Sequence, residues 1–243
     1  MLILYKYYLM HIFYSPDISG NGYTLDENES KHCIRVLRMK RGTPVRLIDG
    51  KGNLYVAVID NPDPRKCSLE ITGIIRDFEK RNYKLHIAIS PVKNHDRFEW
   101  FIEKSVELGI DEITPLICSN TEKPGIKSDR INNLIVSAMK QSLKATRTIL
   151  NETTSFSDFV KRECDGQRMI AHCDSTEEKS KISDVYLKGE NAVILIGPEG
   201  DFSKEEILSA TSVGYQSVHL GSSRLRTETA GVAACHSIYF INQ

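Results

Sequence analysis

The fold is decided by residues 192–207, which read AVILIGPEGDFSKEEI. The first five are apolar and rich in β-branched side chains, a pattern typical of a strand buried in a parallel sheet. Gly197 to Gly200 end that strand, and Ser203 followed by Glu206 predicts the N-cap of a helix. Glycines at the carboxyl end of a strand allow a ligand to approach the backbone. The turn is neither a G-x-G-x-x-G dinucleotide turn nor a P-loop, so a plain strand–turn–helix connection is the alternative.

The sequence on both sides of this stretch alternates between strand and helix patterns. Strands are predicted at 83–90, 112–117, 168–172 and 216–220, and helices at 96–108, 128–145, 203–213 and 227–240. In the helix 96–108, Phe98, Phe101, Ile102 and Ser105 fall on one face, and Gly109 is placed to end the helix. This alternation predicts an α/β fold with a mostly parallel sheet.

The N-terminal part of the chain has a different pattern of short strands. They are predicted at 11–14, 44–49, 53–60 and 67–75, with a hairpin turn between Ile48 and Leu54 and one helix from Asp26 to about Leu37. Short strands with a single helix fit a small β-barrel. The polar stretch 76–82 marks a boundary, and we therefore predict a first domain over residues 1–78 and a second over 79–243.

Composition is that of an ordinary globular protein, with 40% hydrophobic and 26% charged residues among 243. The formal net charge is zero, which argues weakly against a nucleic-acid-binding protein. Basic residues are nevertheless concentrated between 31 and 48, where no acidic residue occurs. They are Lys31, Arg35, Arg38, Lys40, Arg41 and Arg46. This cluster could bind RNA phosphates, and a solvated barrel face is the alternative.

The six cysteines include no C-x-x-C pair, so we interpret them as buried or incidental thiols in a reducing compartment. The run His172-Cys173-Asp174 could ligate a metal, but no second cluster at ligand spacing supports it, and we predict no metal. No apolar run approaches the length of a membrane span. Residues 1–9 make a poor signal peptide and are predicted to be a dispensable extension before Met10. We expect a cytoplasmic protein.

Two further segments contain candidate site residues. In the stretch 217–240, a strand ends at Leu220-Gly221, and a loop then presents Arg224 and Arg226 before a helix that Thr227 is placed to cap. Glu228 falls in the first turn, where a carboxylate complements the helix dipole. In the stretch 93–116, Lys93 and Arg97 lie at a helix start beside a strand end. For each of these charged side chains, simple solvation or helix capping is the alternative.

Four stretches together resemble the RsmE-type 16S rRNA (uracil-N3)-methyltransferases of the SPOUT superfamily: HCIRVLRMKRGT (32–43), KSVELGIDEITPL (104–116), IGPEGDFS (196–203) and LGSSRLRTETA (220–230). The resemblance covers the chain from Met10 onward. It implies a PUA-like β-barrel followed by a SPOUT-type parallel sheet with a C-terminal trefoil knot, a rare threaded topology. It also implies a homodimer with its active site at the subunit interface, S-adenosylmethionine as cofactor, and N3-methylation of a uridine near the 3′ end of 16S rRNA, in free rRNA or the small ribosomal subunit.

The resemblance implies that the cofactor is contacted by Ile196, Gly197, Pro198, Gly200, Leu220, Gly221, Leu225 and Ala230. Our own candidate for stabilising the uracil anion is Arg226, and Glu228 or Glu199 is the candidate base. RNA would be contacted by Lys31, Arg35, Arg38, Lys40, Arg41, Lys93, Arg97, Gln141 and Lys144.

The sequence departs from the family pattern at two positions. Asp201 stands where the family usually has a second glycine, and Lys144 stands where an arginine is common, which keeps the charge but loses the planar fork. One alternative function is another SPOUT RNA methyltransferase that acts on a different base or on a ribose. The other is a non-catalytic RNA-binding assembly protein, against which the intact Gly197, Gly200 and Gly221 argue.

Overall fold

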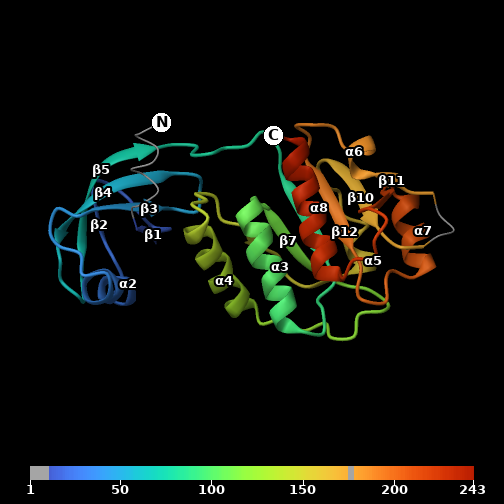
Figure 1. The fold of residues 1–243 in the computed structure, drawn as a ribbon, viewed down its shortest axis with the longest axis horizontal. Coiled ribbons are helices and arrows are strands. Elements are labelled where there is room, and N and C mark those ends of the chain that lie inside the picture. The colour runs from blue at the N-terminus through green and yellow to red at the C-terminus, as the bar shows by residue number, and fades with distance from the viewer. Residues whose placement is uncertain (1–10, 175–177) are drawn as a thin grey trace. The chain divides into compact units, whose positions relative to one another are not determined.

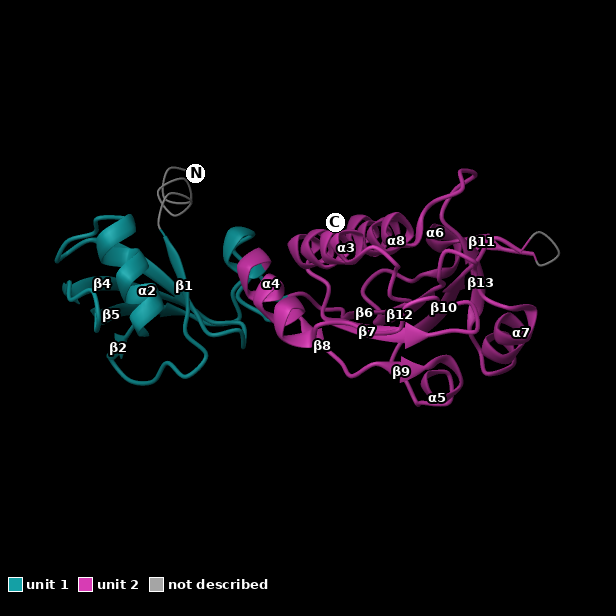
Figure 2. Ribbon diagram, turned by 90° about the horizontal axis from the view of Figure 1, so that it is seen from below, with its two compact units in different colours: residues 1–80, 139–147 teal, residues 81–138, 148–243 magenta. Residues whose placement is uncertain are grey.

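The strand predicted at 192–196 occurs at those residues, as β12 (Ala192–Ile196), and all five of its residues are buried. This computed structural model describes residues 11–174 and 178–243. The predicted extension 1–9 lies outside the described residues. Within the described chain, two compact units are distinguished (Figure 2), and each is treated separately below.

The larger unit is built on a sheet in the order β11-β13-β10-β12-β6-β7-β8, and every pairing in it is parallel, as predicted. A short additional strand, β9, pairs with β7. The strands are β6 (Leu85–Ile89), β7 (Glu112–Ile117), β8 (Ile149–Leu150), β9 (Thr154–Ser155), β10 (Gln167–Ala171), β11 (Ser180–Lys181), β12 and β13 (Gln216–His219).

Helices cover both faces of this sheet. Figure 2 shows α3 (His95–Leu108) and α8 (Thr227–Ile241) on one side and α5 (Phe156–Phe159) on the other. The remaining helices are α4 (Ser128–Gln141), α6 (Ile182–Val185) and α7 (Lys204–Ser212). The predicted face of α3 is confirmed, since Phe98, Phe101, Ile102 and Ser105 are all buried. A Cβ added at Gly231 would lie 2.6 Å from the ring of Phe101, so only glycine lets α8 pack this closely on α3.

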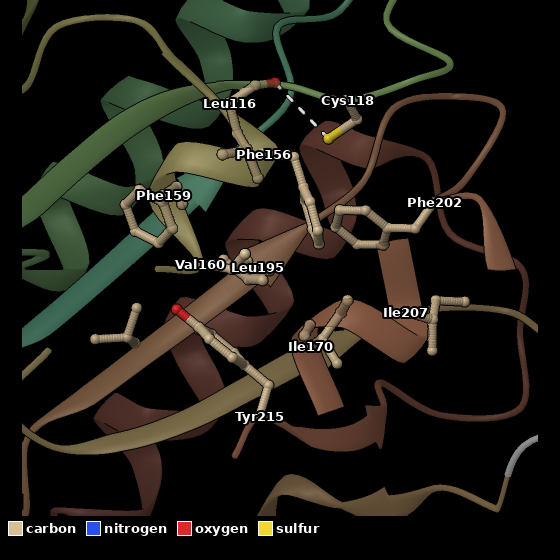
Figure 3. Packing of buried hydrophobic residues seen from close by; sticks show 13 residues of the cluster. Leu116, Cys118, Phe156, Phe159, Val160, Ile170, Leu195, Phe202, Ile207 and Tyr215 are labelled. Atoms are coloured by element: carbon tan, nitrogen blue, oxygen red, sulfur yellow. Dashed lines mark hydrogen bonds between the residues drawn. The ribbon is translucent and has the colours of Figure 1, made fainter. Parts of the chain in front are cut away.

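The apolar core on the α5 side of the sheet joins segments that are distant in sequence. The rings of Phe156 and Phe202 contact each other in a tilted arrangement at 5.6 Å between centroids, above Ile170 and Leu195 of the sheet (Figure 3). Phe202 directly follows the turn at the end of β12. The core therefore fixes the end of the segment from which the candidate site is built.

The smaller unit contains a curled sheet in the order β1-β3-β4-β5-β2 (Figure 1). Its strands are β1 (Ile12–Tyr14), β2 (Gly22–Thr24), β3 (Pro44–Ile48), β4 (Leu54–Asn61) and β5 (Ser68–Ile75). The predicted β3–β4 hairpin is confirmed, and only β1 and β3 pair in parallel. The sheet surrounds a core that includes Phe13, Val45 and Leu69. The short strand β2 was not predicted.

Two helices differ from the prediction near their C-terminal ends. The first begins as α2 (Glu27–Lys31), capped by Asp26 as expected, but continues from His32 as the wider π-helical turn η1 (His32–Val36). The helix predicted to reach 145 ends at Gln141, because Leu143 has φ +60°, which an α-helix cannot accommodate.

The last residues of α4 and the segment that follows it contact the smaller unit. Lys140 in the last turn of α4 forms an ion pair with Glu29 of α2 at 2.6 Å, and Gly52 N donates to Ala145 O at 3.0 Å. The smaller unit accordingly comprises Met1–Lys80 together with Met139–Arg147, of which residues 1–10 are outside the described range. The predicted boundary between residues 78 and 79 would instead assign this returning segment, residues 139–147, to the second domain.

Candidate functional site

The loops that follow β7, β10 and β12 meet at one edge of the larger sheet, because parallel strands all end on the same side. Asn120 Nδ2 donates to Gly200 O at 3.2 Å and to Asp201 O at 3.0 Å. Cys173 N donates to Asp201 Oδ2 at 2.7 Å. Ligands of open α/β sheets bind at this carboxyl edge, so the candidate site lies where ligand binding was predicted.

Most of the turn after β12 is held by packing. Ile196, Gly197 and Pro198 are buried, whereas Glu199 and Gly200 are exposed. A Cβ at Gly197 would lie 3.1 Å from the ring of Phe202, and a Cβ at Gly200 would lie 3.1 Å from Asn120 Cβ. A side chain at either glycine would therefore require Phe202 or Asn120 to shift by a few tenths of an ångström.

The loop after β13, in contrast, is not packed closely at its glycine. Gly221 has φ +115°, and a Cβ at this position would meet no atom within 4 Å. Within the described part of the chain, the amides of residues 222–225 make no hydrogen bond to other backbone atoms. Leu220 and Leu225 are half-buried. The loop thus offers open peptide groups beside apolar side chains, which suits a ligand that has an apolar face and polar edge groups.

A pocket of about 300 Å³ lies beside this loop. It is lined by Leu220 and Gly221 together with side chains of β11, α6, β13 and α8, which include Lys181, His219, His236 and Phe240. The pocket reaches the Leu220–Gly221 turn but does not include the Gly197–Gly200 turn.

Two of the predicted RNA-binding residues contact the predicted acids. Glu199 accepts a hydrogen bond from Lys93 N at 3.1 Å. Arg97 Nε lies 3.9 Å from Glu228 Oε1, and Glu228 is only 7% exposed. The structure therefore brings the start of α3 to the acids of the β12 loop and the α8 N-terminus, while Lys93 Nζ also pairs with Glu122 at 3.1 Å.

Arg226 is exposed at the N-terminus of α8, and it makes no ion pair with any described residue. It occupies the N-cap position, with φ −76° and ψ 157°. The prediction that Thr227 caps α8 is wrong, because Thr227 is already helical and buried. No side chain caps this end, so the first amides of α8 are not satisfied by an N-cap side chain.

Sequence reasoning missed Asn120 and the segment 172–174 as parts of this edge. Asn120 could have been found because it follows the predicted strand 112–117. His172-Cys173-Asp174 follows β10 in the same way, but we considered it only for metal ligation. The described residues contain no group of three or more His, Cys, Asp or Glu side chains arranged to hold a metal ion.

Some of the predicted RNA-binding residues of the smaller unit form ion pairs within the protein, and others do not. Lys31 pairs with Glu27 at 2.6 Å, Arg41 with Asp60 at 3.1 Å, and Lys144 with Glu79 at 3.5 Å. Exposed residues of this set that make no ion pair with a described residue are Arg35, Arg38 and Lys40, and Gln141 is exposed at the end of α4.

Arg46 cannot act with this basic cluster. It is 2% exposed and lies within β3, so the expectation that it contributes to a phosphate-binding surface is wrong. The sequence pattern missed this because β3 is buried along almost its whole length instead of alternating between two environments.

The interpretation of the cysteines is confirmed for the most part. All six are free, and Cys33, Cys67, Cys118 and Cys235 are buried. Burial raises the pKa of Cys33 to about 12, so this thiol is not ionised at neutral pH.

No helix among the described residues combines the length and apolar character needed to cross a membrane.

A second and larger groove, of about 650 Å³, lies at the opposite, amino-terminal edge of the sheet. His86 of β6 lines it and contacts Thr114 Oγ1 at 2.8 Å and the ring of Phe159 at 5.4 Å between centroids. Burial lowers the pKa of His86, opposed by Glu112 and assisted by Arg162. None of the predicted site residues lines this groove.

The comparison with protein families matches both units. Residues 79–239 match the model of an RNA methyltransferase domain, and residues 25–72 match that of an RNA methyltransferase PUA domain. The chain belongs to the RNA methyltransferase domain family. The second match confirms that the curled sheet is PUA-like.

Relatives within this family resemble the chain over nearly its whole length. A probable rRNA-methyltransferase from Porphyromonas gingivalis is 38% identical, with a TM-score of 0.90 over 96% of this chain and 98% of its own. A ribosomal RNA small subunit methyltransferase E from Neisseria gonorrhoeae, bound to S-adenosyl methionine, is 27% identical with a TM-score of 0.85, covering 96% and 98% of the two chains.

A curated relative from Aquifex aeolicus, named ribosomal RNA small subunit methyltransferase E, is 29% identical over 92% of this chain and 96% of its own. The resemblance to the RsmE-type family that the sequence motifs indicated is thereby confirmed.

Proposed function

We propose that this protein uses S-adenosylmethionine to methylate N3 of a uridine near the 3′ end of 16S rRNA. The observation that carries the proposal is the short segment from Gly221 to Glu228. An open peptide turn, an exposed arginine and a buried carboxylate follow one another there at the carboxyl edge of the sheet. The names of the solved and curated relatives support the substrate class.

The cofactor would be held mainly by backbone groups of Ile196, Gly197, Pro198, Gly200, Leu220, Gly221, Leu225 and Ala230. The open surroundings of Gly221 and the amides of 222–225 fit such a ligand. When bound, the cofactor supplies an electrophilic methyl group. The protein's own contribution is to hold the uracil in line with that group, because positioning can supply a large share of the rate.

Arg226 is our candidate for stabilising the negative charge that develops on uracil as N3 loses its proton. Its guanidinium has no ionic partner among the described residues, so its charge is available to a substrate. A fixed cation aimed at developing charge is among the largest contributions that a protein makes to catalysis.

Glu199 and Glu228 are the candidate bases for the N3 proton. Glu199 is exposed and its carboxylate is oriented by the Lys93 amide, so it can reach a base docked on this edge. Glu228 is buried, and its Oε1 lies 3.9 Å from Arg97 Nε at the start of α3. Proton removal by solvent is the alternative that mutation of both residues would test.

The exposed cations of the smaller unit would contact the RNA backbone, with Lys93, Arg97, Gln141 and Lys144 as further candidates. We also propose a homodimer, a trefoil knot in the second domain and a cytoplasmic location. The dimer is supported by the solvent-exposed aromatic side chains of α8, where Phe240 is 69% exposed and stacks on His236 at 5.9 Å. We retain the division into domains 1–78 and 79–243 as a proposal.

The proposal is tested by mass spectrometry of rRNA nucleosides from cells that lack the protein. We expect N3-methyluridine to disappear from 16S rRNA and to return with the wild-type gene but not with Arg226→Ala. Loss of a different methylated base or ribose would instead favour another SPOUT activity. Unchanged rRNA, together with no S-adenosylmethionine binding by the purified protein, would favour a non-catalytic assembly protein.

A further inference from the structure

Asp201 has all of its backbone and carboxylate polar groups engaged, although it is partly exposed. Its N–H donates to Pro198 O at 2.9 Å, and its carbonyl accepts from Asn120 Nδ2 at 3.0 Å. Its Oδ1 accepts from Phe202 N at 2.8 Å and its Oδ2 from Cys173 N at 2.7 Å. One residue therefore connects the segments that follow β7, β10 and β12.

The backbone of Asp201 is in the left-handed region, with φ +63°. Glycine adopts this conformation without a steric cost, whereas aspartate only tolerates it. The turn itself therefore does not require a side chain at this position. What glycine could not provide is the carboxylate, which forms two charge-assisted hydrogen bonds to backbone amides.

The two bonds of the carboxylate act across different segments. The bond to Phe202 N fixes the carboxylate relative to its own turn, and the bond to Cys173 N then holds the segment 172–174 against that turn. Cys173 is exposed, so without this acceptor its amide would face water. The relative position of the two loops thus depends on one side chain.

We infer that Asp201 is a positioning residue for the proposed methyl transfer. It holds the Gly197–Gly200 turn and the 172–174 segment in one arrangement, so that their backbone edges are already placed when the cofactor arrives. The inference rests on the proposed function of this edge. A preorganised site binds more tightly because the loops do not have to be ordered by the ligand.

The inference is tested with Asp201→Gly and Asp201→Asn. The glycine variant relieves the left-handed backbone and removes both acceptors, while the asparagine variant keeps the backbone preference but retains a single acceptor oxygen. Asp77→Gly is the matched control, since Asp77 has φ +50° in the other unit.

The first measurement is hydrogen exchange of backbone amides in the protein without ligand. The amides of Cys173 and Phe202 should both exchange faster in Asp201→Gly, and one of them in Asp201→Asn, while Leu195 within β12 stays protected. Unchanged exchange at Cys173 would overturn the inference. A general loss of protection that includes β12 would also overturn it, because Asp201 would then support the fold as a whole.

The second measurement is titration with S-adenosylmethionine. Asp201→Gly should raise the Kd by about tenfold, the order expected for the loss of a charged hydrogen bond. Asp77→Gly should leave the Kd unchanged. Wild-type affinity in Asp201→Gly would refute this inference alone, whereas a wild-type protein that binds no S-adenosylmethionine would refute the proposed function as well.

Discussion

Gly221 and Gly214 have similar backbones and similar surroundings. Their φ angles are +115° and +94°, and a Cβ at either would meet no atom within 4 Å. They differ in position, because Gly221 follows the carboxyl end of β13 while Gly214 precedes its amino end. The pair therefore separates the cost of backbone strain from the cost of blocking a ligand.

We predict that Gly221→Val abolishes S-adenosylmethionine binding, because the added side chain occupies the open space beside the turn. Gly214→Val should carry a comparable backbone penalty and bind the cofactor normally. Calorimetric titration of both variants, with their Tm values measured in parallel, checks this. Equal affinity in the two variants would show that Gly221 does not face the cofactor.

Arg226 contributes to the chemical step if its free charge faces the reacting base. Arg226→Ala should then slow methyl transfer by about 10²–10³, the usual effect of removing one electrostatic stabiliser, and leave cofactor affinity unchanged. Single-turnover methylation at saturating RNA and cofactor measures it. Arg224→Ala, in the same exposed loop, is the control. A wild-type rate for Arg226→Ala at saturation would leave Arg226 only a binding role.

At the scale of elements, the carboxylate of Glu206 joins α7 by a hydrogen bond to a segment that is distant in sequence. Ser203 and Glu206 form the capping box that the sequence predicted. Glu206 Oε1 also accepts from Ser119 N at 2.8 Å, and the residue is 8% exposed. The carboxylate thus satisfies two amides from distant parts of the chain.

Glu206→Ala should therefore destabilise the protein more than Ser203→Ala. The serine change removes one cap and costs about 1 kcal/mol. The glutamate change leaves the Ser119 and Ser203 amides without their acceptor, which costs about 3 kcal/mol. Urea unfolding of both variants measures the difference. Equal losses of unfolding free energy would show that the bond to Ser119 contributes nothing.

His86 of β6 predicts a dependence of stability on pH. Burial lowers its pKa from the ordinary value of 6.5, so between 6.5 and the lowered value the unfolded chain binds more protons than the folded one. Stability should therefore fall as the pH drops through this window. His86→Gln should flatten that part of the profile. A parallel profile for His86→Gln and wild type, measured by urea unfolding, would contradict this.

The elements that could be predicted from the sequence are those with a strong local signal. β12 was placed at its observed residues, and the caps at Asp26 and Ser203 were found from side chains close in sequence. In contrast, α4 ends because Leu143 has a positive φ angle, and the sequence gives no sign that a leucine adopts this conformation here.

Contacts between distant segments left no local signal at all. The bonds of Asp201 to Cys173 and Asn120 join residues that only the sheet brings together. For the same reason, the site residues could be proposed from motifs, but the residues that hold their loops could not.

At the scale of the whole molecule, RNA binding should depend on the cations that are not neutralised internally. Replacing Arg35, Arg38 and Lys40 together with alanine should lower the salt slope of binding by about 2, at about 0.7 for each contact to single-stranded RNA. Cofactor affinity should not change. Replacing Lys161 and Lys188, both exposed in the other unit, is the control. An unchanged slope in the triple variant would restore the interpretation of this cluster as a solvated surface.

The returning segment Met139–Arg147 has a consequence for how the chain is made. As the polypeptide leaves the ribosome, the strands of the N-terminal sheet emerge first, yet the segment that completes this unit follows only after residues 81–138. At about 5–20 residues per second, translation delays it by about 3 to 12 seconds. Throughout that interval the nascent sheet lacks the partner of Gly52 and the lysine that pairs with Glu29. The N-terminal unit is the first to be synthesised but cannot be the first to finish folding.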